Sequence, residues 1–143
     1  MTEISFHFNV SNPTGYACRL LRKALRRGSA IAVTGPAATL AELDRELWSF
    51  DAADFVPHAW AADVATVPES LRAGTVWLAP EPLTAPRHEA LVNLGEAAPK
   101  GFESFDRVIE VVAVGELERS AARERWKGYA RRGYAIERHE VGE

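Results

Sequence analysis

The sequence predicts an α/β fold, a single three-layer α/β/α domain with a largely parallel sheet. Short apolar segments alternate with amphipathic segments of helical periodicity, as in consecutive β-α-β units. The apolar segment at residues 30–33 is continuous and follows closely on a helix, which is typical of a parallel strand covered on both faces. At 143 residues the chain has the usual length of one domain, so we expect a single domain over residues 1–143.

The first half of the chain predicts two strands and two helices. Residues 4–10 alternate apolar and polar side chains, which indicates a strand. Residues 16–27 carry apolar side chains at helical spacing and predict an amphipathic helix, followed by the strand at 30–33. A second helix is expected over 37–48. Its inward side carries three leucines: Leu40, Leu43 and Leu47.

The second half is less regular. Residues 50–70 hold more aromatic side chains than a simple connection requires. The tail, residues 134–141, either adds an edge strand or remains loose. The other expected elements are strands at 75–79, 90–94 and 107–114, a short turn or half-helix at 102–105, and a last helix at 116–133.

Composition and charge limit the class of protein. The chain is 47% hydrophobic and 26% charged, which is ordinary for a soluble globular protein. Its net charge of -3 argues against a general nucleic-acid coat protein, which would be basic overall. No secretory signal or membrane-spanning run is recognisable. The single cysteine, Cys18, cannot form an intramolecular disulfide and fits a buried helix position, so we expect a cytoplasmic protein.

The last helix carries the most informative surface pattern. Four cations at i, i+4 spacing form what we call the basic stripe: Arg119, Arg123, Lys127 and Arg131. The opposite side, expected to pack inward, carries Leu117, Ala121, Gly128 and Tyr129. The stripe indicates either an acidic ligand or a solvated helix face. Trp126, at the edge of the stripe, offers an apolar wall beside the charge and slightly favours a ligand.

Searches for catalytic chemistry find no candidate. The turn at 34–39 lies where a phosphate loop would lie, but it lacks the Gly-Lys-Ser/Thr ending. The four histidines lack zinc-ligand spacing, and no nucleophile elbow occurs. We therefore assign no catalytic residue, no metal and no cofactor, and expect a binding module without catalytic activity of its own.

Three motifs in order identify a family resemblance. They are Leu-Asp-Arg-Glu-Leu-Trp at 43–48, Phe-Val-Pro-His at 55–58, and Ala-Arg-Glu-Arg-Trp-Lys-Gly-Tyr at 122–129 with Gly-Tyr at 133–134. With them the chain resembles, over nearly its full length, the chi subunits of bacterial DNA polymerase III. Members of that family are α/β/α proteins of the clamp-loader complex without known catalytic activity. Their outline is similar to that of nucleotide-binding folds, but they have no phosphate loop.

The resemblance implies an adaptor with two protein partners. Chi subunits bind the acidic C-terminal tail of single-stranded-DNA-binding protein, which ends in Pro-Phe, and they join the clamp loader through a psi subunit. The matching tail-binding positions are Arg119, Arg123, Trp126 and Lys127, although a tyrosine is usual where Trp126 stands. The link between Val114 and Leu117 is shorter than in enterobacterial members. The matching psi-facing positions are Trp48, Phe55, Val56 and Pro57.

Two other readings remain open at this point. The basic last helix could bind single-stranded nucleic acid directly, with weak sequence preference and steep salt dependence. Alternatively, a nucleotide-dependent enzyme would need to bind its nucleotide at the 34–39 turn.

The psi-facing positions also have an alternative interpretation. Trp48 and Phe55 could equally be core residues, since large aromatics after a helix are often buried.

Overall fold

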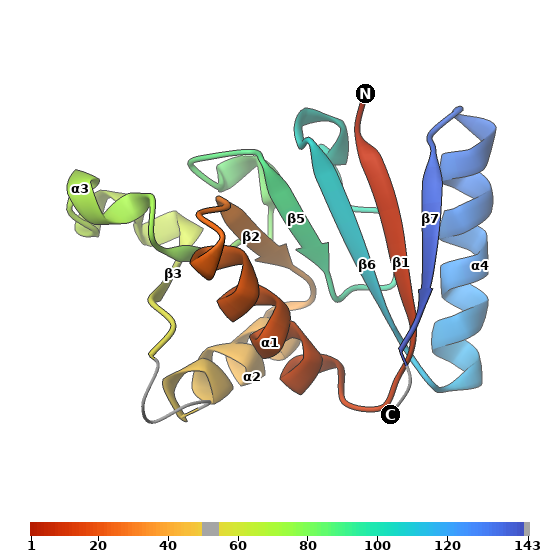
Figure 1. Ribbon diagram of the computed structural model, residues 1–143, viewed down its shortest axis with the longest axis horizontal. Coiled ribbons are helices and arrows are strands. Elements are labelled where there is room, and N and C mark those ends of the chain that lie inside the picture. Colours follow the sequence, from red (N-terminus) through yellow and green to blue (C-terminus); the bar gives the residue numbers. More distant parts are fainter. Residues whose placement is uncertain (50–54, 142–143) are drawn as a thin grey trace.

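A computed structural model describes residues 1–49 and 55–141 and shows seven strands in one sheet (Figure 1). Every strand pair is parallel, and the strand order is β3-β4-β2-β5-β6-β1-β7. The largely parallel sheet predicted from the alternating pattern is thus confirmed. The strands are β1 Glu3–Val10, β2 Ile31–Thr34, β3 His58–Trp60, β4 Val76–Leu78, β5 Ala90–Asn93, β6 Arg107–Ala113 and β7 Ile136–Glu140.

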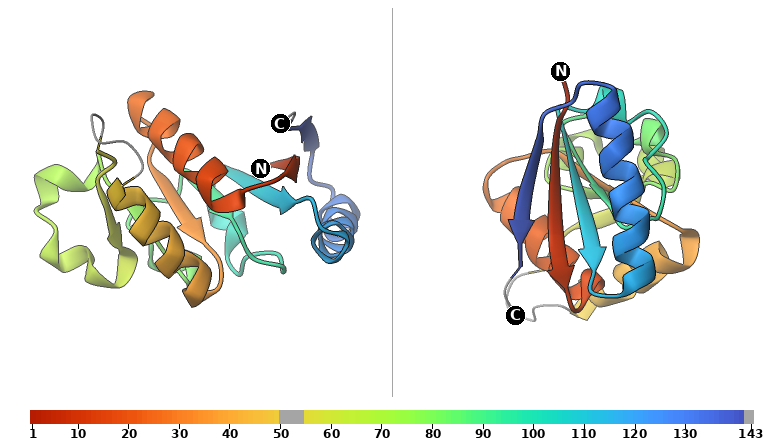
Figure 2. Two further views of the ribbon diagram at one scale, coloured as in Figure 1. Left: turned by 90° about the horizontal axis from the view of Figure 1, so that it is seen from below. Right: turned by 90° about the vertical axis from the view of Figure 1, so that its right-hand side faces the viewer.

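Helices lie on both faces of this sheet, with α1 and α2 on one face and α4 on the other (Figure 2). One buried cluster fills the space between α1, α2 and the sheet, and a second lies under α4 and the short 3-10 turns. The helices are α1 Pro13–Arg26, α2 Ala37–Ser49, α3 Glu69–Arg72 and α4 Glu116–Arg131, with 3-10 turns η1 Ala61–Thr66, η2 Pro82–Thr84 and η3 Phe102–Ser104. None of the helices described is both long and apolar enough to cross a membrane.

The helix α1 begins three residues earlier than the hydrophobic pattern predicts. The side chain of Asn12 accepts a hydrogen bond from the Gly15 amide at 3.1 Å, and Pro13 occupies the first helical position. Gly28 follows the helix with φ of 76°, a left-handed conformation that suits glycine. Cys18 is fully buried on the inner side of α1, as expected.

The tail after α4 adds an edge strand, one of the two outcomes that the sequence allowed. Gly133, with φ of 83°, reverses the chain, and Tyr134 packs edge-on against Phe102 with ring centroids 5.3 Å apart. β7 then runs parallel to β1, with Ile4 opposite Ile136. The stretch 50–70 contains β3, η1 and part of α3, none of which was predicted, and its residues 50–54 lie outside the described part of the chain.

Candidate protein-interaction sites

A network of buried polar side chains attaches α4 to the sheet. The Glu110 carboxylate is fully buried in β6 and accepts hydrogen bonds from Arg125 Nε at 3.0 Å and the Tyr129 hydroxyl at 2.6 Å. The side-chain amide of Asn93 donates to the same carboxylate at 2.9 Å. Arg125 Nη1 donates to the Glu96 carbonyl at 2.7 Å. The network joins β5, β6 and α4, and it fixes how α4 is rotated about its own axis.

Burial shifts the pKa of both acidic groups in this network. Desolvation raises the pKa of Glu110, while Arg125 is the strongest opposing influence, ahead of the hydrogen bonds from Tyr129 and Asn93. Desolvation and the nearby Glu110 carboxylate also raise the pKa of the Tyr129 hydroxyl. Tyr129 therefore keeps its proton and remains a hydrogen-bond donor to Glu110.

The buried side of α4 differs from the predicted one. Tyr129 is buried as expected, but Leu117 is 81% exposed and Arg125 is only 7% exposed. The reason is that Glu110 supplies a buried counter-charge under Arg125, so the helix turns this cation inward and its first turn faces solvent. Two other residues expected to pack inward are partly covered: Ala121 and Gly128.

The basic stripe lies on the solvent side of α4. The side chains of Arg119, Arg123 and Lys127 are 49%, 57% and 67% exposed. Glu116 pairs with Arg119 at 3.2 Å and Arg123 at 3.0 Å, and Glu124 pairs with Lys127 at 3.3 Å. Hydrogen bonds from Arg123 and then Arg119 lower the pKa of Glu116. Ion pairs this exposed are weak, so an incoming carboxylate can take the place of these glutamates.

Trp126 lies beside the stripe and has one side against the core. Its ring centroid is 5.1 Å from that of Phe6 and 6.3 Å from that of Phe8, and part of the ring remains exposed. The Arg138 guanidinium, from β7, lies 4.6 Å above the Phe8 ring. A partly exposed aromatic surface is thus bordered by cations from α4 and from β7.

Sequence reasoning missed the contribution of β7 to this surface. Arg138 and Phe8 are separated by more than a hundred positions, and only the parallel pairing of β7 with β1 brings them together. The sequence feature that could have predicted this contribution is the charged segment after Gly133, which is typical of an exposed edge strand.

Three aromatic rings cluster near the opposite edge of the sheet. The centroids of Trp48 and Phe55 are 5.2 Å apart, and Trp48 meets His58 edge-on at 5.0 Å. Trp48 is 65% exposed and Phe55 50% exposed, so neither is a core residue. His58 lies between the Val56 carbonyl at 2.7 Å and the Asp44 carboxylate at 3.0 Å, which connects β3 to α2.

The four residues expected to face a psi subunit do not all share this surface. Pro57 is exposed beside Phe55 and lines the same shallow hollow of about 410 Å³. Leu71, which sequence reasoning did not select, also lines the hollow and is 59% exposed. Val56, by contrast, is 2% exposed and belongs to the core between α2 and the sheet. It supports the aromatic surface from beneath and has no side-chain area to offer a partner.

The turn at 34–39, considered above as a nucleotide site, is closely packed, and no metal site is found among the described residues. Gly35 lies in the turn between β2 and α2, where an added Cβ would come within 3.3 Å of Leu94. This turn is therefore packed closely against the segment after β5. Within residues 1–49 and 55–141, no three His, Cys, Asp or Glu side chains gather closely enough to hold a metal ion.

Comparison with known proteins places the chain in a family. Residues 1–137 match the family described as DNA polymerase III chi subunit, HolC. A DNA polymerase III subunit chi of Pseudomonas aeruginosa is 34% identical over 146 residues, covering 99% of this chain and 98% of the relative. Another, from Haemophilus influenzae, is 28% identical over 127 residues, covering 88% and 85%. The chain therefore belongs to the chi-subunit family of DNA polymerase III, whose members are accessory subunits in DNA replication.

Proposed function

We propose that this protein is a non-catalytic adaptor of the replisome that acts in the cytoplasm. One partner is the acidic C-terminal tail of single-stranded-DNA-binding protein, and the other is the clamp loader, reached through a psi subunit. The observation that carries the proposal is the exposed basic stripe of α4 lying directly beside the partly exposed Trp126 ring.

The chemistry of the tail matches this surface in two respects. Its acidic side chains and terminal carboxylate can pair with Arg119, Arg123 and Lys127, whose present partners are weakly held carboxylates of the same helix. Its terminal phenylalanine needs an apolar contact, and Trp126 supplies an aromatic ring next to these cations. Charge and apolar contact are thus available within one short stretch of α4.

Direct binding of single-stranded nucleic acid by α4 is less well supported. The sequence of α4 contains Glu116, Glu118 and Glu124 among its five cations, so its field is partly cancelled along its length. A phosphate chain passing along the stripe would meet these carboxylates repeatedly. A peptide that replaces one or two of the local ion pairs meets less repulsion.

The aromatic surface near β3 supports the second contact. Trp48, Phe55, Pro57 and Leu71 expose apolar area around one hollow, and soluble proteins seldom leave such side chains clustered and uncovered. A hydrophobic segment of the psi subunit would bury them. Trp48 in particular has the residue type that most often dominates binding energy at protein interfaces.

Titration of the full-length protein with the tail peptide tests the first contact. The peptide is used with and without its terminal phenylalanine, and binding is followed by calorimetry. We expect the complete peptide to bind and the shortened peptide to bind much more weakly, because both the ring and the properly placed carboxylate are lost. Equal binding of the two peptides would contradict tail capture at this site.

A further inference from the structure

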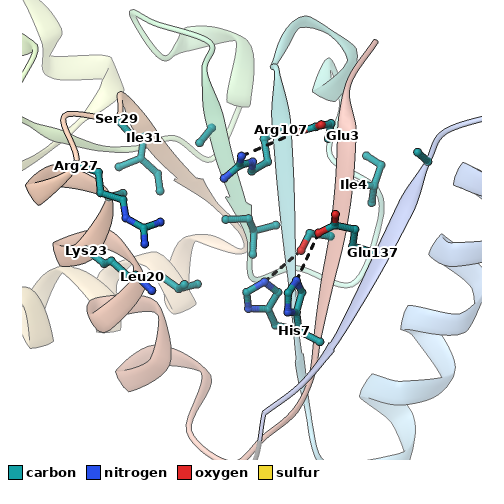
Figure 3. Close-up of a pocket in the computed structure, with 16 residues that line it drawn as sticks. Glu3, Ile4, His7, Leu20, Lys23, Arg27, Ser29, Ile31, Arg107 and Glu137 are labelled. Atoms are coloured by element: carbon teal, nitrogen blue, oxygen red, sulfur yellow. Dashed lines mark hydrogen bonds and ion pairs between the residues drawn. The ribbon is translucent and has the colours of Figure 1, made fainter.

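The face of the sheet that carries α1 is left open along β1 and β7. α1 packs beside these strands, and a trough of about 490 Å³ separates the helix from them (Figure 3). Its floor includes Ser5 and His7 of β1 and His139 of β7, all at least partly exposed. Parallel sheets are usually covered on both faces, so an open polar face of this kind needs an explanation.

One wall of the trough is basic, because two cations of a basic segment, Lys23 and Arg27, line it. The segment from Pro13 to Arg27 contains five Lys or Arg residues and no acid, in a chain whose net charge is -3. Lys23 and Arg27 reach over the trough from this wall (Figure 3). Within the described part of the chain, neither side chain has an ion pair. They are one helical turn apart, about 6 Å along the axis.

The floor and the far side of the trough carry imidazole rings and the Glu137 carboxylate. His7 and His139 lie with ring centroids 4.7 Å apart, and His7 hydrogen-bonds to the Tyr16 hydroxyl and to Ser5. Burial, and secondarily His139, lowers the pKa of His7 to about 4, so its ring is neutral near pH 7. The carboxylate of Glu137 stands beside His139 at 3.6 Å.

We propose that this trough binds single-stranded nucleic acid, with the phosphates along Lys23 and Arg27 and the bases against the imidazole rings of the sheet. A nucleic-acid strand is charged along one edge only, and its bases are neutral. This asymmetry matches a trough that has unpaired cations on the α1 wall and imidazole rings with Glu137 on the strand side, where the one lining cation, Arg107, is paired with Glu3 at 4.0 Å. Rings beside a line of cations are the usual elements of single-strand binding surfaces.

Other polyanions fit the trough less well. An acidic peptide carries carboxylates on alternating sides of its backbone, so some would face Glu137 or Glu3 on the far side. An anionic membrane presents headgroup charge but no planar bases that could stack on the ring pair. The geometry points to a site distinct from the basic stripe, because α1 and α4 lie on opposite faces of the sheet (Figure 2).

The test compares two double variants of the full-length protein. Lys23→Ala/Arg27→Ala removes the basic wall of the trough, and Arg123→Ala/Lys127→Ala removes two cations of the stripe. Binding of a fluorescein-labelled oligothymidylate of about 15 nucleotides is followed by anisotropy at several salt concentrations. We expect the first variant to lose roughly tenfold in affinity at low salt, and its log–log salt slope to decrease by about 1.4, the value for two phosphate contacts to a single strand.

The stripe variant is the matched control and should bind the oligonucleotide as the parent does. The charge-conserving variant Lys23→Arg/Arg27→Lys should retain binding, while His139→Ala should lose roughly fivefold or more through lost stacking. An unchanged salt slope in Lys23→Ala/Arg27→Ala overturns the proposal. The proposal is also overturned if this variant loses binding to polyglutamate or to anionic vesicles to the same extent, because the site would then bind polyanions in general. The tail-peptide titration, run on the same proteins, reports separately on tail capture.

Discussion

Removing Arg125 should destabilise the protein by leaving the Glu110 carboxylate buried without a cation. In the parent, Arg125 Nε lies 3.0 Å from this carboxylate, and the two side chains are 6% and 0% exposed. Breaking a buried ion pair by removing one partner typically costs about 3–5 kcal/mol. We therefore expect Arg125→Met, which keeps most of the side-chain volume, to unfold at a melting temperature lower by about 10 °C or more.

The size of this loss should depend on pH, because Glu110 can take up a proton. Burial raises the pKa of Glu110, and Arg125 is the largest influence that opposes the rise. A raised carboxyl pKa stabilises the fold below the pKa of the unfolded chain, and this contribution is lost as pH rises through the folded-state pKa. Without Arg125 the pKa rises further, so the loss of stability should be larger at pH 8 than at pH 5.

A double-mutant cycle in urea denaturation separates the pair from its surroundings. Glu110→Gln, Arg125→Met and the combined variant are measured at both pH values, and the m-value serves to check that unfolding remains two-state. The combined variant should lose less stability than the two single variants added together, by roughly 1–3 kcal/mol. A loss in Arg125→Met that is the same at pH 5 and pH 8 would refute the role assigned to Glu110.

Further outcomes are expected at the two interaction surfaces. Arg123→Ala or Lys127→Ala should weaken tail-peptide binding about tenfold with an unchanged circular dichroism spectrum, whereas Glu116→Gln should strengthen it by removing a competing carboxylate. Trp126→Ala should remove most of the tail binding that survives several hundred millimolar salt, because apolar contact is not screened; full retention there would place the apolar contact elsewhere. Phe55→Ala should reduce pull-down of a psi subunit while tail binding stays intact, since a side chain 50% exposed is not needed for folding. An unfolded variant would show that Phe55 is needed for the fold and would contradict the interface assignment.

The regular elements were predictable because their signals are local. The helix of residues 37–48 was located from leucines at helical spacing, and all three leucines are buried in α2. β3 was missed because it has three residues and takes its conformation from pairing with β4. β7 was left undecided because four of its five side chains are exposed and it has no apolar alternation. Its pairing with β1, which no local pattern encodes, makes it a strand.

The candidate sites, too, were predictable where the signal is local and not where it depends on a distant residue. The basic stripe follows from i, i+4 spacing alone, so its exposed positions on α4 were accessible from sequence. The inward position of Arg125 was not, because its partner Glu110 lies on another element fifteen positions away. A single glutamate inside the apolar run of β6 was the available sign that a buried cation would be needed.

The topology of the sheet places the two proposed contact surfaces far apart. β3 and β7 form the two edges of the seven-stranded order, and all the strands between them are parallel and hydrogen-bonded. The Trp48 and Phe55 surface lies near the first edge, and the Trp126 surface near the second. Surfaces at opposite ends of one continuous sheet share no side chain, so under the proposed function neither partner would have to displace the other. The buried Glu110 network ties α4 to that sheet, so the two proposed surfaces are connected through packed β-structure and not through a linker.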